Sequence, residues 1–290
     1  MRVFTFGLII LILAVFPSCK NSKEQSEVKR TVSVSILPQK YFVEALAGDS
    51  FEVNVMIPPG TSPASYDPNP RQLKDLGESD LYLKIGNLGF EKAWMGKIKN
   101  NHKDLKIIDL SAGIDPVETN IKHGDHSHIG VDPHIWMSPK SALKMAENTA
   151  NAIIRFDPVC KDLIRENLEK LKGKISELDR EFTVMAAELE IKKFIIFHPA
   201  LTYLARDYGL EQIPMEFEGK QPSAAYMKEI IDKARAENIK LVFIQKEFDQ
   251  SNAKQISKDL NARLVQIDPL TEDWMGMMLE VLESFDAESL

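Results

Sequence analysis

Residues 159–190 read VCKDLIRENLEKLKGKISELDREFTVMAAELE, and this stretch decides the fold. Its apolar residues recur at alternating spacings of four and three, which places them on one stripe of a helix. They are Ile164, Leu168, Leu171, Ile175, Leu178, Phe182, Met185 and Leu189. A continuous helix over the stretch would be about 48 Å long at 1.5 Å per residue. An ordinary helix of one domain is the alternative, but this length favours a rigid helix that joins two lobes.

Short apolar runs alternate with helical patterns on both sides of this stretch. Before it, the strand candidates are TVSVSIL (31–37), FEVNVMI (51–57), LYLKIG (81–86) and LKIIDL (105–110). After it, they are KFIIF (193–197), QIPMEF (212–217), KLVFI (240–244) and RLVQI (263–267). Apolar strands separated by helices are typical of parallel sheets covered on both faces. The sequence therefore predicts two Rossmann-like α/β lobes, over 31–158 and 191–290, joined by a linking helix over 159–190.

The N-terminus has the pattern of an export signal. Arg2 precedes an apolar run from Val3 to Phe16, which is too short to span a bilayer comfortably. The run ends before Cys19, and a cysteine at this position resembles the lipidation site of a bacterial lipoprotein. We expect a signal peptide over 1–19, a lipid anchor at Cys19 and a polar tether over 20–30. A plain secretory signal with an incidental cysteine is the alternative.

The composition and net charge exclude only one class of function. The 290 residues are 44% hydrophobic and 27% charged, as in an ordinary globular protein, and the formal net charge is −7. This charge offers no basic surface for nucleic acid, so we expect no nucleic-acid partner.

Three residues with metal-binding side chains lie at loop positions far apart in the sequence. His198 and Asp268 each follow a predicted strand, and His134 lies between a polar loop and the next helix. Ligand sites of open α/β sheets lie at the carboxyl ends of the strands. Two imidazoles and a carboxylate suit zinc, and also manganese or ferrous iron. Taken singly, His198 and Asp268 could equally cap the helices that follow them.

Four short motifs in this order resemble those of a known family. They are Pro58-Pro59-Gly60…Tyr66-Asp67-Pro68-x-Pro70, Asp132-Pro133-His134-Ile135-Trp136, His198-Pro199-Ala200 and Asp268-Pro269-Leu270. Together they resemble the zinc/manganese-binding lipoproteins of bacterial ABC importers, the ZnuA/TroA-like (cluster 9) family. The resemblance covers residues 31–290.

The resemblance implies a function and a set of ligands. It implies a non-catalytic protein that captures zinc between two lobes and delivers it to a membrane permease with its ATPase. His134 and His198 would be the imidazole ligands, and Asp268 the carboxylate ligand. We expect a monomer on the periplasmic side or the cell surface, with manganese or iron as the alternative metal.

One ligand of the family is missing from this chain. The family's first histidine lies two residues before the tyrosine of the PPG…Y loop, where this chain has Ala64. Water is the simplest replacement, since zinc readily keeps one open position. The other candidates are His123, His126, His128, Tyr66 and Glu218.

The stretch HGDHSH (123–128) contains three histidines within a polar, glycine-containing segment. We predict that residues 111–131 form a mobile loop, because glycine and polar residues dominate them. The cluster resembles, in shortened form, the histidine-rich loop of zinc-specific family members. His123, His126 and His128 would then form a secondary site that binds zinc weakly and passes it inward. A solvated loop with chance histidines is the alternative.

Other functions remain open at this level. A metal-dependent enzyme could use the same two histidines and one carboxylate, although no general base lies at a defined spacing from them. A two-lobed binder of a chelated metal or corrinoid would share the architecture, and an adhesin is not tested by the sequence. Glu247 and Asp249 follow a predicted strand and could line the cleft, but we expect them to cap the next helix.

Overall fold

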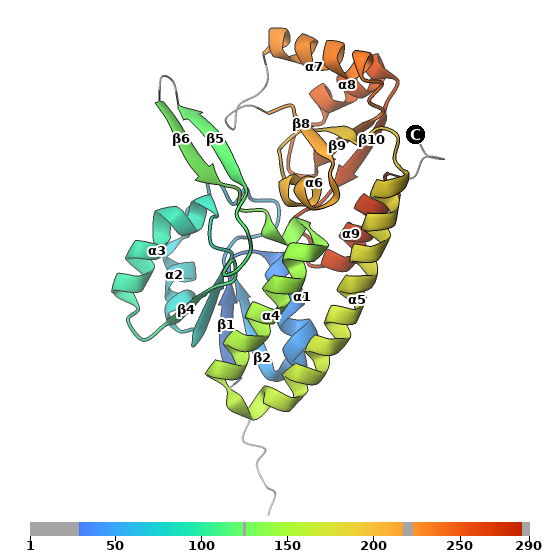
Figure 1. Ribbon diagram of the computed structural model, residues 1–290. Helices are drawn as coiled ribbons and strands as arrows, with labels where there is room; N and C mark the ends of the chain where they lie inside the picture. The colour runs from blue at the N-terminus through green and yellow to red at the C-terminus, as the bar shows by residue number, and fades with distance from the viewer. Residues whose placement is uncertain (1–28, 124–125, 217–222, 286–290) are drawn as a thin grey trace, which may run out of the picture.

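The computed structural model describes residues 29–123, 126–216 and 223–285 (Figure 1). The signal peptide over 1–19, the anchor Cys19 and most of the tether lie outside the described residues. No helix of the described part is long and apolar enough to cross a membrane.

The N-terminal lobe is built on a four-stranded parallel sheet with the order β2-β1-β3-β4. β1 is central and pairs with both neighbours, Val32 lying opposite Val53 on one side and Leu81 on the other. Its last three residues are buried, as expected for a strand covered on both faces. The strands are β1 (Arg30–Val34), β2 (Phe51–Val55), β3 (Leu81–Lys84) and β4 (Lys106–Asp109).

The C-terminal lobe repeats this plan with a second parallel sheet of order β10-β9-β7-β8. Its central strand β9 is buried along its whole length. The strands are β7 (Lys193–Ile196), β8 (Glu211–Pro214), β9 (Leu241–Gln245) and β10 (Arg263–Ile267). Both predicted sheets are therefore confirmed, strand by strand.

Helices connect the strands and cover the sheets (Figure 1). Those before the long helix are α1 (Leu37–Ala47), α2 (Pro70–Gly77), α3 (Gly89–Asn101) and α4 (Pro139–Phe156), with short 3-10 turns at Gly48–Ser50, Ile135–Met137 and Pro158–Cys160. Those after it are α6 (Thr202–Tyr208), α7 (Ala224–Ala236), α8 (Ser251–Leu260) and α9 (Trp274–Glu283). Proline opens α1, α2 and α4, where its missing amide costs no hydrogen bond.

The long helix α5 (Lys161–Glu188) has 28 residues and is therefore about 42 Å long. The predicted stripe forms its buried side, with Ile164, Leu171, Ile175, Leu178 and Phe182 all inside the core. Figure 1 shows α5 running along the molecule beside both lobes, in contact with α1 and α4 at one end and with α6 and α9 further along. The predicted linking helix is confirmed, except that it begins after the 3-10 turn Pro158–Cys160.

Two buried tryptophans join the lobes. Trp136 donates its indole N–H to the Pro269 carbonyl at 2.8 Å, and Trp274 donates its own to the Trp136 carbonyl at 2.7 Å. The Trp274 ring also packs on Phe42 of α1, with ring centroids 5.0 Å apart. Because each indole is fully buried and hydrogen-bonded, the two lobes share one continuous core at this point.

The predicted mobile loop over 111–131 is wrong. Most of it forms an antiparallel hairpin of β5 (Glu118–His123) and β6 (His126–Val131), which projects from the N-terminal lobe (Figure 1). Backbone pairing along six residue pairs, from Glu118 with Val131 to His123 with His126, holds the two strands together. A high content of glycine and polar residues does not prevent backbone pairing of this kind, so composition alone did not predict the hairpin.

Candidate metal-binding site

The candidate ligands of the C-terminal lobe lie at one edge of its sheet. His198 comes two residues after β7, and Asp268 directly follows β10. Both strands are parallel, so their carboxyl ends meet at the same edge, as the sequence predicted.

His134 is oriented by a buried carboxylate two residues before it. Its Nδ1 lies 2.9 Å from Oδ1 of Asp132, whose side chain is only 3% exposed. The other carboxylate oxygen accepts a hydrogen bond from the Thr202 hydroxyl of α6 at 2.8 Å. Burial by itself would raise the pKa of Asp132, but the His134 ring and the hydrogen bonds to the carboxylate outweigh it and lower the pKa. An ionised carboxylate only accepts, so His134 donates from Nδ1 and keeps Nε2 for another partner.

His198 has the same arrangement with different partners. Its Nδ1 lies 2.7 Å from Oε2 of Glu216, which follows β8 on the neighbouring strand. The buried amide of Gln245, at the end of β9, donates to the His198 carbonyl at 2.6 Å and accepts from the His198 amide at 3.1 Å. The backbone and the ring of His198 are therefore both fixed, and Nε2 is again the free nitrogen.

The two imidazoles lie side by side, with ring centroids 5.2 Å apart. Each has Nδ1 occupied by a carboxylate and Nε2 free, which is the arrangement found around histidine ligands of metal ions. The carboxylate fixes the tautomer and makes the imidazole a better electron donor. The pair can therefore hold a metal ion such as zinc through two nitrogens.

Asp268 does not join the two histidines in this arrangement. Its carboxylate accepts from the Leu270 amide at 3.2 Å and lies 3.6 Å from the ammonium of Lys246. Across the described part of the chain, no three His, Cys, Asp or Glu side chains are close enough together to hold a metal ion at once. Of the three predicted ligands, the structure brings His134 and His198 together and leaves Asp268 paired with a lysine.

Glu247 and Asp249, both expected to cap a helix, behave differently. Asp249 accepts from the amide of Ser251, the first residue of α8, at 2.8 Å, but the N-cap residue of this helix is Gln250, so the expected cap is wrong. Glu247 is half-buried near the two histidines and Asp268. Burial raises the pKa of its carboxyl and Asp268 raises it further, whereas His198 and His134 oppose the shift.

The loop that contains Ala64 is fixed to the start of α3. The Phe90 amide donates to the Pro63 carbonyl at 3.0 Å, and a Cβ on Gly89 would lie only 2.4 Å from the Ala64 carbonyl. Tyr66 packs against Phe90 with ring centroids 5.7 Å apart, and its hydroxyl donates to the side chain of Gln72 in α2. Tyr66 is therefore engaged within its own lobe. Glu218, another candidate fourth ligand, lies outside the described residues.

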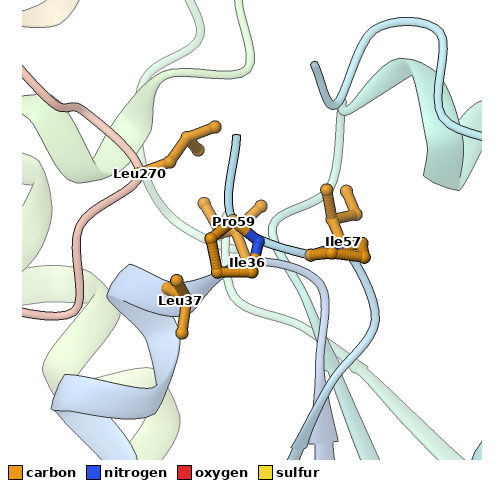
Figure 2. Close-up of a pocket in the computed structure, with 6 residues that line it drawn as sticks. Ile36, Leu37, Ile57, Pro59 and Leu270 are labelled. Carbon is orange, nitrogen blue, oxygen red and sulfur yellow. The ribbon is translucent and has the colours of Figure 1, made fainter. Parts of the chain in front are cut away.

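An apolar hollow of about 170 Å³ lies beside Asp268, between the two lobes. Figure 2 shows Leu270 of the C-terminal lobe facing Leu37, Ile36 and Pro59 of the N-terminal lobe.

The sequence also missed the residues that orient the ligands. Asp132 lies inside the DPH motif, and its spacing of two from His134 was a usable signal. Glu216 and Gln245 lie on other strands, and their contacts with His198 depend on the strand order β9-β7-β8. No local pattern in the sequence gives that order.

Two parallel-sheet lobes, a stiff connecting helix and a pair of oriented imidazoles at the sheet edges define a solute-binding protein with a site suited to a metal ion. The chain belongs to the ZnuA family: the family described as "Zinc-uptake complex component A periplasmic" matches residues 32–287. It is 26% identical over 275 residues to the high-affinity zinc uptake system protein ZnuA of Bacillus subtilis, covering 90% of this chain and 85% of that protein. It is 27% identical to the iron-binding protein YfeA of Yersinia pestis, and the match covers 90% of this chain and 84% of that protein. Among solved structures, it superposes on a zinc-bound ZnuA deletion mutant with a TM-score of 0.81 and 35% identity. The superposition covers 90% of this chain and 98% of that one.

The Glu216 carboxylate gives the first testable prediction. Changing Glu216→Gln replaces an acceptor-only group by an amide, so the His198 ring loses its fixed tautomer. We expect zinc affinity to fall by roughly 10- to 100-fold, the usual effect of losing such a partner. Isothermal titration of the variant measures this, with Glu211→Gln at the start of the same strand as the control. Unchanged affinity in Glu216→Gln would show that His198 is not a ligand.

Proposed function

We propose that this protein is the zinc-binding component of a bacterial ABC importer, which captures the ion and delivers it to the membrane permease. The observation that carries the proposal is the pair of imidazoles, His134 and His198, each held through Nδ1 by a carboxylate. The ZnuA relatives, named for zinc uptake or solved with zinc bound, support the choice of metal. Manganese and iron are the alternative metals, and the similarity to the iron-binding protein YfeA supports iron as one of them.

Three ligands would come together around the ion in this proposal. His134 and His198 bind through Nε2, and Asp268 exchanges the ammonium of Lys246 for the metal. Because only deprotonated imidazoles bind, affinity falls in acid. The role is one of binding and release, so no reaction is assigned to the site.

The family and the N-terminal sequence support a location and a membrane partner for the protein. Family membership makes a membrane permease with its ATPase the expected partner and places the protein outside the cytoplasm. A lipid anchor at Cys19 would hold a monomer near that permease through the tether over 20–30.

The hairpin is proposed as a secondary capture site. Residues directly opposite each other in a ladder share a face, as do residues two apart on one strand. His123 is paired with His126, and His128 is two residues further along β6. This backbone register supports a capture site that would hold zinc more weakly than the cleft does.

A zinc titration of the full chain, with manganese as competitor, tests the proposal. We expect one tight site that prefers zinc and additional weak binding. In the triple variant His123→Asn, His126→Asn and His128→Asn, the weak binding should disappear and the tight site should remain. His102→Asn, at the end of α3, is the matched control. If the triple variant lost the tight site, or the native chain had none, the cleft would not be the binding site.

A further inference from the structure

Helix α6 connects the segment of His198 to the segment of His134. The helix begins at Thr202, four residues after His198, and the Ala200 amide donates to the His198 carbonyl at 2.7 Å in the turn between them. The first two residues of α6 both contact Asp132, the carboxylate that orients His134. The C-terminal lobe therefore directly holds the group that orients the histidine of the N-terminal lobe.

The main chain of Asp132 is held on both sides. Its carbonyl accepts from the Tyr203 hydroxyl at 3.0 Å, and its amide donates to the Val117 carbonyl at 2.9 Å. Tyr203 is buried, and its hydroxyl also accepts from the Val117 amide at 3.4 Å. Because the main chain is fixed, the direction of the Asp132 carboxylate depends on the contacts of its two oxygens.

The Thr202 hydroxyl controls one of these two oxygens. It lies 2.8 Å from Oδ2 of Asp132 and 3.0 Å from the Pro199 carbonyl, but it has only one proton to donate. The ionised carboxylate is the stronger acceptor of the two. Since Oδ1 contacts His134 and Oδ2 contacts Thr202, rotation of the carboxylate would disturb both hydrogen bonds.

Gln212 of β8 orients the Thr202 hydroxyl in turn. Its Oε1 accepts from the Leu201 amide at 3.2 Å, so its Nε2 is the atom that donates to the hydroxyl oxygen. A donor at this oxygen leaves the hydroxyl proton for the carboxylate. Glu216, which orients His198, lies two residues after the end of the same strand. The hydrogen-bonded partners of both imidazoles are therefore tied to β8.

We propose that Thr202 is a positioning residue of the metal site, which sets the His134 ring relative to the His198 ring through Asp132. A binding site needs its donor atoms held within roughly 0.5 Å of the productive geometry. The ring centroids are 5.2 Å apart, so a small rotation of either ring changes the separation of the two free nitrogens. This inference rests on the proposed function, since it concerns the same ion.

The test compares Thr202→Val, which removes the hydroxyl and keeps the shape, with Thr202→Ser, which keeps the hydroxyl. Zinc affinity and the thermal midpoint without metal are measured for each variant of the full chain. We expect Thr202→Val to lower zinc affinity by roughly 5- to 10-fold, less than the loss of a partner that touches a ligand directly. Thr202→Ser should bind like the native chain. Thr183→Val on α5, whose hydroxyl donates to a backbone carbonyl of its own helix, is the matched control and should also bind normally.

A spectroscopic signature distinguishes positioning from a general effect on the fold. The imidazole nitrogen signals of His134 and His198 are measured by NMR in the metal-free protein. In Thr202→Val the His134 signals should shift, because its carboxylate partner is free to rotate. The His198 signals should not shift, because Glu216 still holds that ring.

Three results would overturn the inference while leaving the proposed function intact. The first is native zinc affinity in Thr202→Val, whatever the change in its thermal midpoint. The second is an equal loss of affinity in Thr202→Val and Thr202→Ser, which would assign the effect to packing rather than to the hydroxyl. The third is an unchanged set of His134 signals in Thr202→Val. Absence of a tight site in the native chain would instead overturn the proposed function.

Discussion

Replacing His198 by alanine is expected to remove the tight zinc site, lowering affinity by more than about 100-fold. The change deletes one of the two imidazoles that lie side by side in the candidate site, with ring centroids 5.2 Å apart. Loss of a partner that merely orients a ligand costs roughly 10- to 100-fold, so loss of the ligand itself costs more. His134→Ala should have the same effect, because the two rings have equivalent positions and partners.

The control for this experiment is His102→Ala at the end of α3, where the ring packs under Gly77 and is remote from the cleft. Its zinc affinity should equal that of the native chain. Circular dichroism of each variant confirms that the fold is retained. Tight binding that survived His198→Ala and His134→Ala would place the site elsewhere.

Replacing Trp274 by alanine is expected to cause a large loss of stability. The side chain is fully buried, and removing a buried tryptophan costs about 3–5 kcal/mol. The change also leaves the Trp136 carbonyl without its donor and removes the ring that packs on Phe42. We expect the thermal midpoint to fall by roughly 10 °C, measured by calorimetry on the full chain.

Two further variants separate the loss of buried apolar volume from the loss of the indole hydrogen bond. Trp94→Ala removes a tryptophan that is only half-buried on α3, and should lower the midpoint much less. Trp274→Phe keeps most of the apolar volume but removes the indole donor, so it isolates the hydrogen bond to Trp136. A loss in Trp274→Ala no larger than in Trp94→Ala would show that the lobes are not joined through this residue.

The sequence predicted the secondary structure well where periodicity was long or strands were apolar. The stripe from Ile164 to Leu189 was readable because eight apolar residues recur over about seven helical turns. The hairpin was missed because the composition of 111–131 was given more weight than its pattern. β-Branched residues recur at every second position before Gly124-Asp125 (Val117, Thr119, Ile121) and after it (Ile129, Val131), and a two-residue Gly-Asp connection between such runs favours a hairpin.

The candidate site was predictable only in part. His134 and His198 were found because each lies in a short motif after a predicted element, and the structure places their rings together. Asp268 was placed correctly at a strand end, but its pairing with Lys246 depends on how two neighbouring loops pack.

The reciprocal indole hydrogen bonds bear on how fast the ion can be exchanged. They connect Trp136, two residues after His134, to Pro269, one residue after Asp268, so the spacing between these two ligands is set across the lobes. Opening by rotation of whole domains, a process of microseconds to milliseconds, would have to break this buried joint first. Exchange of Lys246 for the metal at Asp268 needs only side-chain rotation, which takes picoseconds to nanoseconds for exposed groups. We therefore expect the residence time of the ion to depend on the strength of its bonds to the candidate ligands rather than on the rate of domain rotation.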